Sequence, residues 1–346
     1  MSDLSPPLPV AEAMSRSGFY PGAPEVTMCE THSAWVFLAG DRAYKVKKPV
    51  RMAFLDFSTL ERRRAVCHEE VRANRALAGS LDMNVRGVVV REGRYVLARA
   101  DAPDAVEYAI EMRRFDERQT MASLVGRGEL RDEDLRAVAR RLADFHAKAD
   151  ALAPTDPLDD VKGACDGNAR ELLALADDAT ARRILAAERF TDAFLVARRE
   201  EIVARAAAGH VRDVHGDLRA EHVVLEQPVA IVDRLEFDPS LREIDVADDL
   251  AFLVMDLERL GAGACARRLA AAYRDAGGDP GSDALIAFYA TYRALVRSKV
   301  ALLRAEQLDD PAQSGAARED AEALLELGER LAWRARGPLV LAVGGP

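Results

Sequence analysis

The stretch V-H-G-D-L-R-A-E-H-V-V-L-E-Q-P-V-A-I-V-D, residues 214–233, carries most of the information about the fold. Its two short apolar runs, V-V-L and V-A-I-V, predict strands, and E-Q-P between them predicts a turn. Since a hairpin brings the residue before its first strand beside the residue after its second, we expect His222 next to Asp233. The glycine-containing loop just before the hairpin is expected to place Asp217 on the same rim.

This grouping has the composition that phosphoryl transfer needs. One carboxylate, here that of Asp217, orients the attacking hydroxyl, and further side chains hold magnesium on the phosphates. The residues alone therefore predict a catalytic loop followed by a metal-binding hairpin.

The composition indicates a globular protein and limits the partners that it can bind. A chain of 346 residues is long enough for two lobes, and 49% apolar with 31% charged residues is typical of a globular protein with a sizeable core. The net charge of -10 argues against a nucleic-acid partner, because phosphate backbones require a basic surface. A local basic pocket for a nucleotide remains compatible with this charge.

Cysteines and apolar runs indicate the compartment. The four cysteines are widely spaced and form no C-x-x-C pair, which favours free thiols in a reducing cytoplasm over a zinc site. The N-terminal M-S-D-L-S-P-P-L-P lacks the basic and apolar regions of a secretory signal. No apolar run has the length of a membrane span. We expect a cytoplasmic protein without a membrane partner.

The first third of the chain predicts a small antiparallel sheet with one helix. Gly40-Asp41 and Glu92-Gly93 are hairpin turn signals between apolar runs. Ser58-Thr59-Leu60-Glu61 has the pattern of a capping box, from which a helix is expected to run to Gly79. The five expected strands are Trp35 to Leu38, Ala43 to Val46, Val85 to Val90, Tyr95 to Ala98 and Glu107 to Met112.

Beyond Phe115 the chain becomes helical. Apolar residues recur at helical spacing, as in Leu135, Val138, Leu142 and Phe145. The hairpin after His222 is the one strand-like segment expected there. Further helices are expected over 166–177, 183–207, 247–260, 264–275, 283–306 and 318–335. The fold class is therefore α+β.

Several motifs together resemble the aminoglycoside phosphotransferase and choline kinase group, and more narrowly a bacterial branch of uncharacterised phosphotransferases. The resemblance implies the bilobal protein-kinase-like fold, with an N-lobe over residues 1–113 and a C-lobe over 114–336. It also implies ATP and Mg²⁺ as cofactors and a small-molecule hydroxyl as acceptor. The segments that carry the likeness are T-H-S-A-W-V-F-L, Y-K-V-K-K-P-V, F-L-D-F-S-T-L-E-R-R, H-G-D-L-R-A-E-H, I-D-V-A-D-D-L-A-F-L-V-M-D-L-E and Y-R-A-L-V-R-S-K-V.

The resemblance assigns roles in the C-terminal motifs. Asp217 of H-G-D-L matches the Asp that orients the acceptor hydroxyl, and Asp233 matches the metal-binding Asp. Arg219 stands where protein kinases have a Lys near the transferred phosphate. At the position of the usual Asn, five residues after the catalytic Asp, this chain has His222. An imidazole nitrogen suits softer metals than magnesium, so Mn²⁺ becomes an alternative metal.

The resemblance also assigns a nucleotide site in the N-lobe. Lys45 matches the Lys that grips the phosphates, and Glu70 matches its helix partner. The segment of Thr31, His32 and Ser33 occupies the position of the loop that covers the phosphates. Met112, at the end of the fifth strand, is a further expected nucleotide contact.

Other interpretations of these residues stay open. Lys47 lies on the same strand face as Lys45, because strand side chains alternate with a period of two. Glu69 competes with Glu70. Each of these residues, and the basic cluster around them, can be merely solvated. Turn capping by Asp217 and strand termination by Asp233 are the plain structural alternatives.

Four further residues are expected to be structural. The ring of His215 is expected to bond the loop backbone. Asp245 and Asp249 lie one helical turn apart near a helix start, so capping and bracing the catalytic loop are favoured over chemistry. His146, on a helix, is expected to pack or face solvent.

The last ten residues, 337–346, read as an apolar strand that runs into glycines. Such a strand precedes a P-loop in nucleotide-binding domains, so the segment suggests the start of a second domain or a partner contact, with a frayed terminus as the alternative.

Three functions compete. The first is an ATP-dependent small-molecule kinase, whose acceptor pocket would be built from helices within 155–210 and 255–305. The second is a nucleotide-binding pseudokinase, suggested by His222. The third, a metallohydrolase that uses the histidines and aspartates of the loop and hairpin, is the weakest, because further ligand clusters are missing and a strand Lys stays unexplained.

Overall fold

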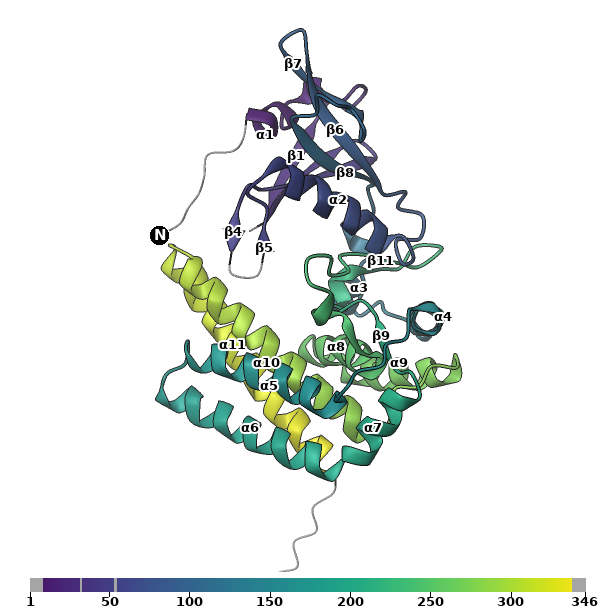
Figure 1. Cartoon of the computed structure of the whole chain (residues 1–346), viewed down its shortest axis with the longest axis vertical. Helices are drawn as coiled ribbons and strands as arrows, with labels where there is room; N and C mark the ends of the chain where they lie inside the picture. The colour runs from purple at the N-terminus through teal and green to yellow at the C-terminus, as the bar shows by residue number, and fades with distance from the viewer. Residues whose placement is uncertain (1–8, 32, 53–54, 338–346) are drawn as a thin grey trace, which may run out of the picture. The chain divides into compact units, whose positions relative to one another are not determined.

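The computed structural model describes residues 9–31, 33–52 and 55–337 (Figure 1). Its contacts divide this part of the chain into two compact units. The sheet unit contains the chain up to Leu124 together with Glu221–Pro239. The helical unit contains Val125–Ala220 and the chain from Ser240 onward. The predicted hairpin thus belongs to the sheet unit.

Among the described residues, six antiparallel strands form the main sheet, in the order β1-β2-β3-β8-β6-β7. The two hairpins predicted from Gly40-Asp41 and Glu92-Gly93 are present as β2–β3 and β6–β7. Strand β1 was not among the five expected strands. Its residues V-T-M-C-E are mostly exposed at the sheet edge and show no apolar alternation, so the sequence gives no signal for it. The strands are β1 (Val26–Glu30), β2 (Ala34–Ala39), β3 (Arg42–Lys47), β6 (Asn84–Arg91), β7 (Arg94–Arg99) and β8 (Glu107–Arg113).

Helix α2 (Leu60–Asn74) packs against β8, as Figure 1 shows. Its start corrects the expected capping box. Ser58 donates its hydroxyl and its N–H to Asp56, at 2.5 and 3.0 Å, so its side chain is already engaged. Thr59 caps the helix instead and accepts the N–H of Arg62 at 3.3 Å. The core between helix and sheet contains Cys67, Val71, Tyr108 and Ile110.

A second cluster of buried apolar residues packs on the sheet and includes residues of the short helix α1 (Pro9–Met14). Its largest members are Met14, Tyr20, Trp35, Phe37, Tyr44 and Val46. The short strands β4 (Arg51–Met52) and β5 (Leu55–Asp56) pair with each other. The predicted hairpin after His222 is formed by β10 (Val223–Val224) and β11 (Ala230–Ile231).

The helical unit confirms most of the expected helices, with changes at their ends. The single helix expected over 183–207 divides at Arg198 into α6 and α7. A small antiparallel pair, β9 (Val211–Asp213) with β12 (Glu243–Asp245), was not expected, because both strands are only three residues long. The helices, starting from α3, whose residues are divided between the two units, are α3 (Met121–Arg127), α4 (Asp132–Lys148), α5 (Pro157–Leu173), α6 (Asp178–Ala197), α7 (Arg199–Ala207), α8 (Val246–Arg259), α9 (Gly263–Asp275), α10 (Asp283–Gln307) and α11 (Pro311–Ala335).

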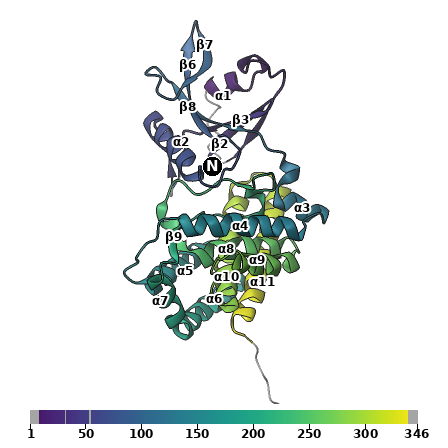
Figure 2. The same cartoon turned by 90° about the vertical axis from the view of Figure 1, so that its right-hand side faces the viewer.

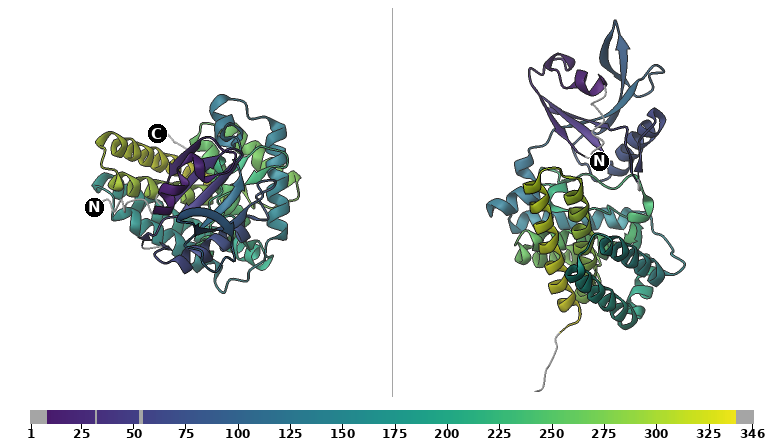
Figure 3. Two further views of the ribbon diagram at one scale, coloured as in Figure 1. Left: turned by 90° about the horizontal axis from the view of Figure 1, so that it is seen from above. Right: turned by 90° about the vertical axis from the view of Figure 1, so that its left-hand side faces the viewer.

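Two helix packings organise this unit. Helix α4 lies along α9, which in turn packs on α8 (Figure 2), and the four apolar residues predicted for α4 are all buried. The long helices α10 and α11 run side by side (Figure 3). Gly328 of α11 faces α10, since a Cβ at this position would lie in ordinary van der Waals contact, 3.6 Å from that of Ala294. Within the described chain no helix is long and apolar enough to span a bilayer.

Candidate active site

The predicted site residues form two groups, one in each unit. In the sheet unit, Lys45 of β3 donates to Glu70 of α2 at 2.8 Å. Strand β3 is central in the sheet, and α2 turns Glu70 toward it, where the carboxylate is 1% exposed. Although burial opposes the charge, Lys45 and Lys47 hold the pKa of Glu70 below its ordinary value. The pairing expected from the sequence is therefore present, while its role toward a nucleotide stays a prediction.

Lys47 reaches the same carboxylate from the same strand face. Its Nζ lies 2.5 Å from Oε2 of Glu70, without normal hydrogen-bond geometry, and donates to Oε1 of Glu236 at 2.7 Å. The side chain is 2% exposed, so Lys47 is a buried member of the cluster and not a solvated lysine. Glu236 was missed by the sequence analysis. Its position three residues after Asp233 was the available signal, but no periodicity marks it.

Asp233 joins this cluster through Lys45, whose Nζ is 3.1 Å from Oδ1. The positive charge of Lys45 is the main reason why the pKa of Asp233 lies well below its usual range, so the group is a carboxylate at neutral pH. Its backbone has φ 58, in the left-handed region that non-glycine residues rarely adopt. Asp233 is therefore a charged residue held in an unusual backbone conformation.

The hairpin brings His222 and Asp233 together, as predicted. The backbone N–H of Val232 donates to the carbonyl of His222 at 3.0 Å. Nε2 of His222 lies 4.0 Å from Oδ2 of Asp233 and 3.7 Å from Oε1 of Glu221. One imidazole and one carboxylate fit a cation whose other ligands come from a nucleotide and water, and the nitrogen donor favours manganese over magnesium. Across the described chain, no group of three or more His, Cys, Asp or Glu side chains could hold a metal ion.

Two residues of the expected phosphate-covering segment, Thr31 and Ser33, make backbone hydrogen bonds near β2 and β3. Thr31 donates its N–H to the carbonyl of Ala34 at 2.9 Å, and its Oγ1 accepts the N–H of Ala34 at 3.0 Å. The carbonyl of Ser33 accepts the N–H of Lys48 at 2.8 Å, which ties Ser33 to the end of β3. His32 lies outside the described residues. Met112 of β8 is half-buried and stands opposite Ala43 of β3.

The second group is in the helical unit. Asp217 and Arg219 form a two-point ion pair, with Nε and Nη2 each 3.0 Å from a carboxylate oxygen. The backbone N–H of Asp217 donates to Nδ1 of His215 at 3.2 Å, so the ring of His215 bonds the loop backbone as predicted. The arrangement fixes the orientation of the Asp217 carboxylate.

Helix α8 supports this loop, as expected from Asp245 and Asp249. Asp245 caps the helix by accepting the N–H of Ala247 at 2.8 Å. Asp249 accepts the N–H groups of His215 and Gly216 at 3.2 and 2.8 Å. Burial opposes its charge, but a hydrogen bond from His146 and the loop N–H groups keep the pKa of Asp249 below its ordinary value.

Further braces of the loop were not predicted. Asp256, two turns along α8, accepts the N–H of Ala220 at 2.9 Å. Arg293 of α10 forms two bonds of 2.7 Å to Asp248 and donates to the carbonyl of Gly216 at 3.4 Å. These partners are distant in sequence, so no local pattern could identify them.

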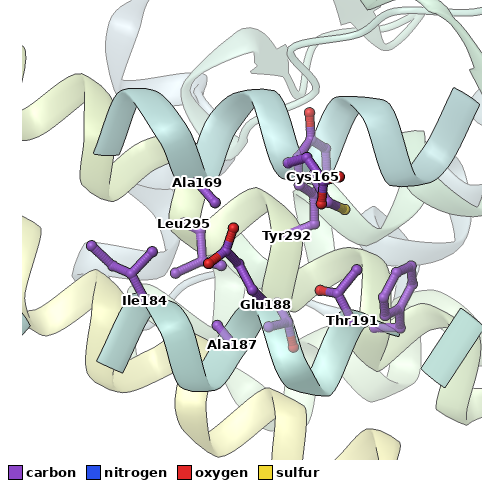
Figure 4. Close-up of a pocket in the computed structure, with 11 residues that line it drawn as sticks. Cys165, Ala169, Ile184, Ala187, Glu188, Thr191, Tyr292 and Leu295 are labelled. Carbon is purple, nitrogen blue, oxygen red and sulfur yellow. The ribbon is translucent and has the colours of Figure 1, made fainter. Parts of the chain in front are cut away.

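A small cavity lies between α5, α6 and α10, within the ranges expected for the acceptor pocket (Figure 4). Its volume is about 20 Å³, room for about one water molecule. Cys165, Glu188, Thr191 and Tyr292 line it beside apolar residues. The cavity is too small for the acceptor of a kinase in the conformation described.

Comparison with curated proteins finds longer relatives of similar sequence. No family model matches it. The uncharacterized proteins Rv2004c of Mycobacterium tuberculosis and Mb2027c of Mycobacterium bovis are each 35% identical over 303 residues, which is 85% of this chain and 58% of the relative. The chain thus spans little more than half the length of these curated relatives.

Solved structures show the fold. The choline kinase of Cryptosporidium parvum Iowa II matches with a TM-score of 0.55 and 10% identity over 91% of each chain. A putative aminoglycoside phosphotransferase of Ralstonia eutropha matches with a TM-score of 0.50 and 14% identity, over 92% of this chain and 95% of that one. The chain therefore has the bilobal α+β fold of these structures, as its motifs predict.

Proposed function

We propose that this protein is an ATP-dependent phosphotransferase that moves the γ-phosphoryl group to a hydroxyl of a small molecule. The observation that carries the proposal is the pairing of Lys45 with the buried Glu70, with the anionic Asp233 3.1 Å from the same Nζ. A lysine held by a helix carboxylate beside a metal-binding carboxylate is the arrangement that protein kinases use to position nucleotide phosphates.

Each residue has a distinct task in this proposal. Lys45, fixed by Glu70, contacts the phosphates, and the segment that contains Thr31 and Ser33 covers them. Asp233 and His222 would hold the divalent cation, which neutralises phosphate charge when it is bound. Asp217 accepts a hydrogen bond from the acceptor hydroxyl and orients it for attack. Arg219, already paired with Asp217 at 3.0 Å, supplies positive charge near the transferred group.

The surroundings of the Asp217 carboxylate suit a hydroxyl as the acceptor group. A carboxylate that is fixed by Arg219 and by the bonded loop backbone suits a neutral hydroxyl, whose proton it receives as the phosphoryl group is transferred. The oxygen of that hydroxyl forms the new bond to the γ-phosphorus, and ADP leaves with the electron pair of the broken bond. Two observations support ATP as the donor. One is the pairing of Lys45 with Glu70 and Asp233, and the other is the likeness of the fold to that of the phosphotransferase structures.

The test separates nucleotide binding from transfer. Wild-type protein is expected to bind Mg-ATP and to release ADP faster with one member of a panel of sugars, amino alcohols and nucleosides. Asp217→Ala is expected to keep the affinity for Mg-ATP and to lose transfer by roughly 100- to 10,000-fold, because the carboxylate acts on the acceptor. Asp144→Ala, at an exposed position of α4, is the matched control. Normal turnover by Asp217→Ala would remove this residue from the mechanism.

A second function is favoured by one observation. The ring of His222 is 8% exposed and takes the place where an oxygen ligand is usual in the resembling group. A nucleotide-binding protein without transfer activity would bind ATP with this site and release no ADP with any acceptor. Equilibrium binding together with an ADP-release assay on the same sample distinguishes the two functions.

A further inference from the structure

Lys47 is a buried charge in the cluster of Lys45, Glu70 and Asp233 to which the proposed function gives no task. A lysine 2% exposed is costly unless it is paired, since removing an ammonium from water costs several kcal/mol. Its Nζ contacts Glu70 at 2.5 Å and Glu236 at 2.7 Å and lies 5.3 Å from the ring centre of Phe57. These neighbours surround the ammonium group. Lys47 is thus committed to the protein and not available to a ligand.

The partners of Lys47 come from separate parts of the sheet unit. Glu70 lies on α2, Phe57 precedes that helix, and Glu236 follows the hairpin strand β11 by five residues. Lys47 itself ends β3. One ammonium group therefore connects the central strand, the helix and the segment that carries Asp233.

Asp233 needs such support on both sides. A non-glycine residue with positive φ is strained, and this conformation persists only where its surroundings hold it. On the N-terminal side, Val232 is bonded to the hairpin through the carbonyl of His222. On the C-terminal side, Arg234 donates its N–H to Oδ1 of Asn74 at 3.1 Å, and its Nη1 donates to the carbonyl of Ala73 at 3.1 Å.

The ion pair of Glu236 with Lys47 is the next tie along the chain. It joins the segment after Asp233 to β3, whereas Arg234 joins it to the end of α2. The pair also affects charge. With Lys47 present, Glu70 divides its two oxygens between two lysines; without it, Lys45 alone faces Glu70 and Asp233. Lys45 would then be drawn more strongly to the carboxylates and away from a phosphate.

We propose that Lys47 and Glu236 form a positioning pair that fixes the Asp233 carboxylate and divides the charge of Glu70, so that Lys45 can engage nucleotide phosphates. The inference rests on the proposed function, because it concerns the same nucleotide site. Neither residue touches the reacting groups. Their effect is exerted through Asp233 and Lys45.

The experiment separates positioning from packing. Replacing a buried ion pair by apolar residues of similar size is often neutral for stability, whereas removing one partner is not. Lys47→Met is expected to lower the melting temperature, and the double variant Lys47→Met with Glu236→Leu is expected to recover most of it. Lys48→Met is the matched control, because Lys48 pairs with the exposed Glu30 outside this cluster.

Nucleotide binding is measured with a fluorescent ATP analogue, with and without Mg²⁺. In the double variant, the Mg²⁺-dependent part of the affinity is expected to stay at least about tenfold below that of wild type, the size of effect seen when supporting groups of metal ligands are lost. Wild-type affinity in a stable double variant would overturn the proposal and leave Lys47 a packing residue.

Two further outcomes also decide between the positioning role and its alternatives. If the double variant does not fold, Glu236→Leu alone is used, because it removes the tie to Lys47 while Glu70 still pairs the ammonium group. Weakened Mg²⁺-dependent binding then supports the proposal, and unchanged binding overturns it. If wild-type protein binds no nucleotide, the proposed function fails and this inference fails with it. Binding by wild type and variants alike defeats the positioning role alone.

Discussion

Asp249 accepts the backbone N–H of Gly216 at 2.8 Å, one residue before Asp217. The carboxylate is fully buried, and His146 donates to it or shares a proton with it at 3.0 Å while bonding Tyr273 at 2.7 Å. A chain of buried polar groups therefore runs from α9 through α4 and α8 to the loop. It fixes the backbone from which Asp217 projects.

Asp249→Asn tests this brace. An amide in place of the carboxylate accepts weaker hydrogen bonds and brings an N–H₂ group among donors, so unfolding free energy is expected to fall by roughly 1–3 kcal/mol. Phosphoryl transfer is expected to fall further than stability explains, while Mg-ATP affinity stays unchanged, because the proposed nucleotide residues lie in the sheet unit. Chemical denaturation and an ADP-release assay measure the two effects. Asp275→Asn, at an exposed position of α9, serves as control.

The charge of Asp233 predicts a dependence of stability on pH. Lys45 lowers the pKa of the folded-state carboxyl below the unfolded value of about 3.9. The contribution of the charge is therefore complete above that value and is lost as pH falls below it. Asp233→Asn removes the charge and keeps a residue that tolerates positive φ.

The unfolding free energy of wild type and Asp233→Asn is compared from pH 7 to the lowest pH at which both fold. The stability advantage of wild type is expected to be constant near neutrality and to shrink as pH falls toward and below about 4. An advantage that does not change with pH would show that the Lys45–Asp233 contact does not hold the carboxylate in its charged form.

The sequence predicted the fold where the signal is local. The apolar spacing of Leu135, Val138, Leu142 and Phe145 identified α4, and these side chains are all buried. Strand β1 gave no such signal, because four of its five residues are exposed. Helix α2 is capped by Thr59 and not by Ser58, one residue later than expected. Ser58 donates its hydroxyl to Asp56, a contact that a capping pattern does not include.

The contacts of the candidate site were likewise predictable only where the signal is local. Short spacing and hairpin geometry placed His222 beside Asp233, and the resemblance of the motifs paired Lys45 with Glu70. Strand periodicity could not choose between the two lysines of β3, because both point to one face, and the structure shows that both reach the same carboxylate. Glu236 and the Asp248–Arg293 pair depend on tertiary contacts, which a single sequence does not show.

Two glycines provide a matched stability test of the helical unit. A Cβ on Gly278 would collide with the ring of Tyr273, which bonds His146. Gly278→Ala is therefore expected to destabilise the protein by roughly 1–3 kcal/mol, as overpacking does. Gly167, inside α5, has open space around its Cβ position, so Gly167→Ala is expected to stabilise by about 0.5–1 kcal/mol. Thermal unfolding of both variants checks the prediction, and equal effects would contradict the packing around Tyr273.

His222→Asn is the most informative change at the candidate metal site. It replaces the imidazole by an oxygen ligand of the kind usual in the resembling group. Because magnesium favours oxygen ligands and manganese accepts nitrogen more readily, the variant is expected to keep or raise activity with Mg²⁺ and to lose any preference for Mn²⁺. The measurement is the ratio of ADP-release rates with the two metals, together with the metal-dependent affinity for ATP.

The outcome also separates the two proposed functions. A wild-type protein that transfers slowly with Mg²⁺ and faster with Mn²⁺ makes His222 a ligand that tunes a working kinase. A wild type without transfer and a variant with transfer would make the protein a nucleotide-binding module that is inactive because of this one side chain. If the variant changes neither rate nor metal preference, the 4.0 Å separation of Nε2 and Oδ2 does not mark a shared cation, and Asp233 would hold the metal without His222.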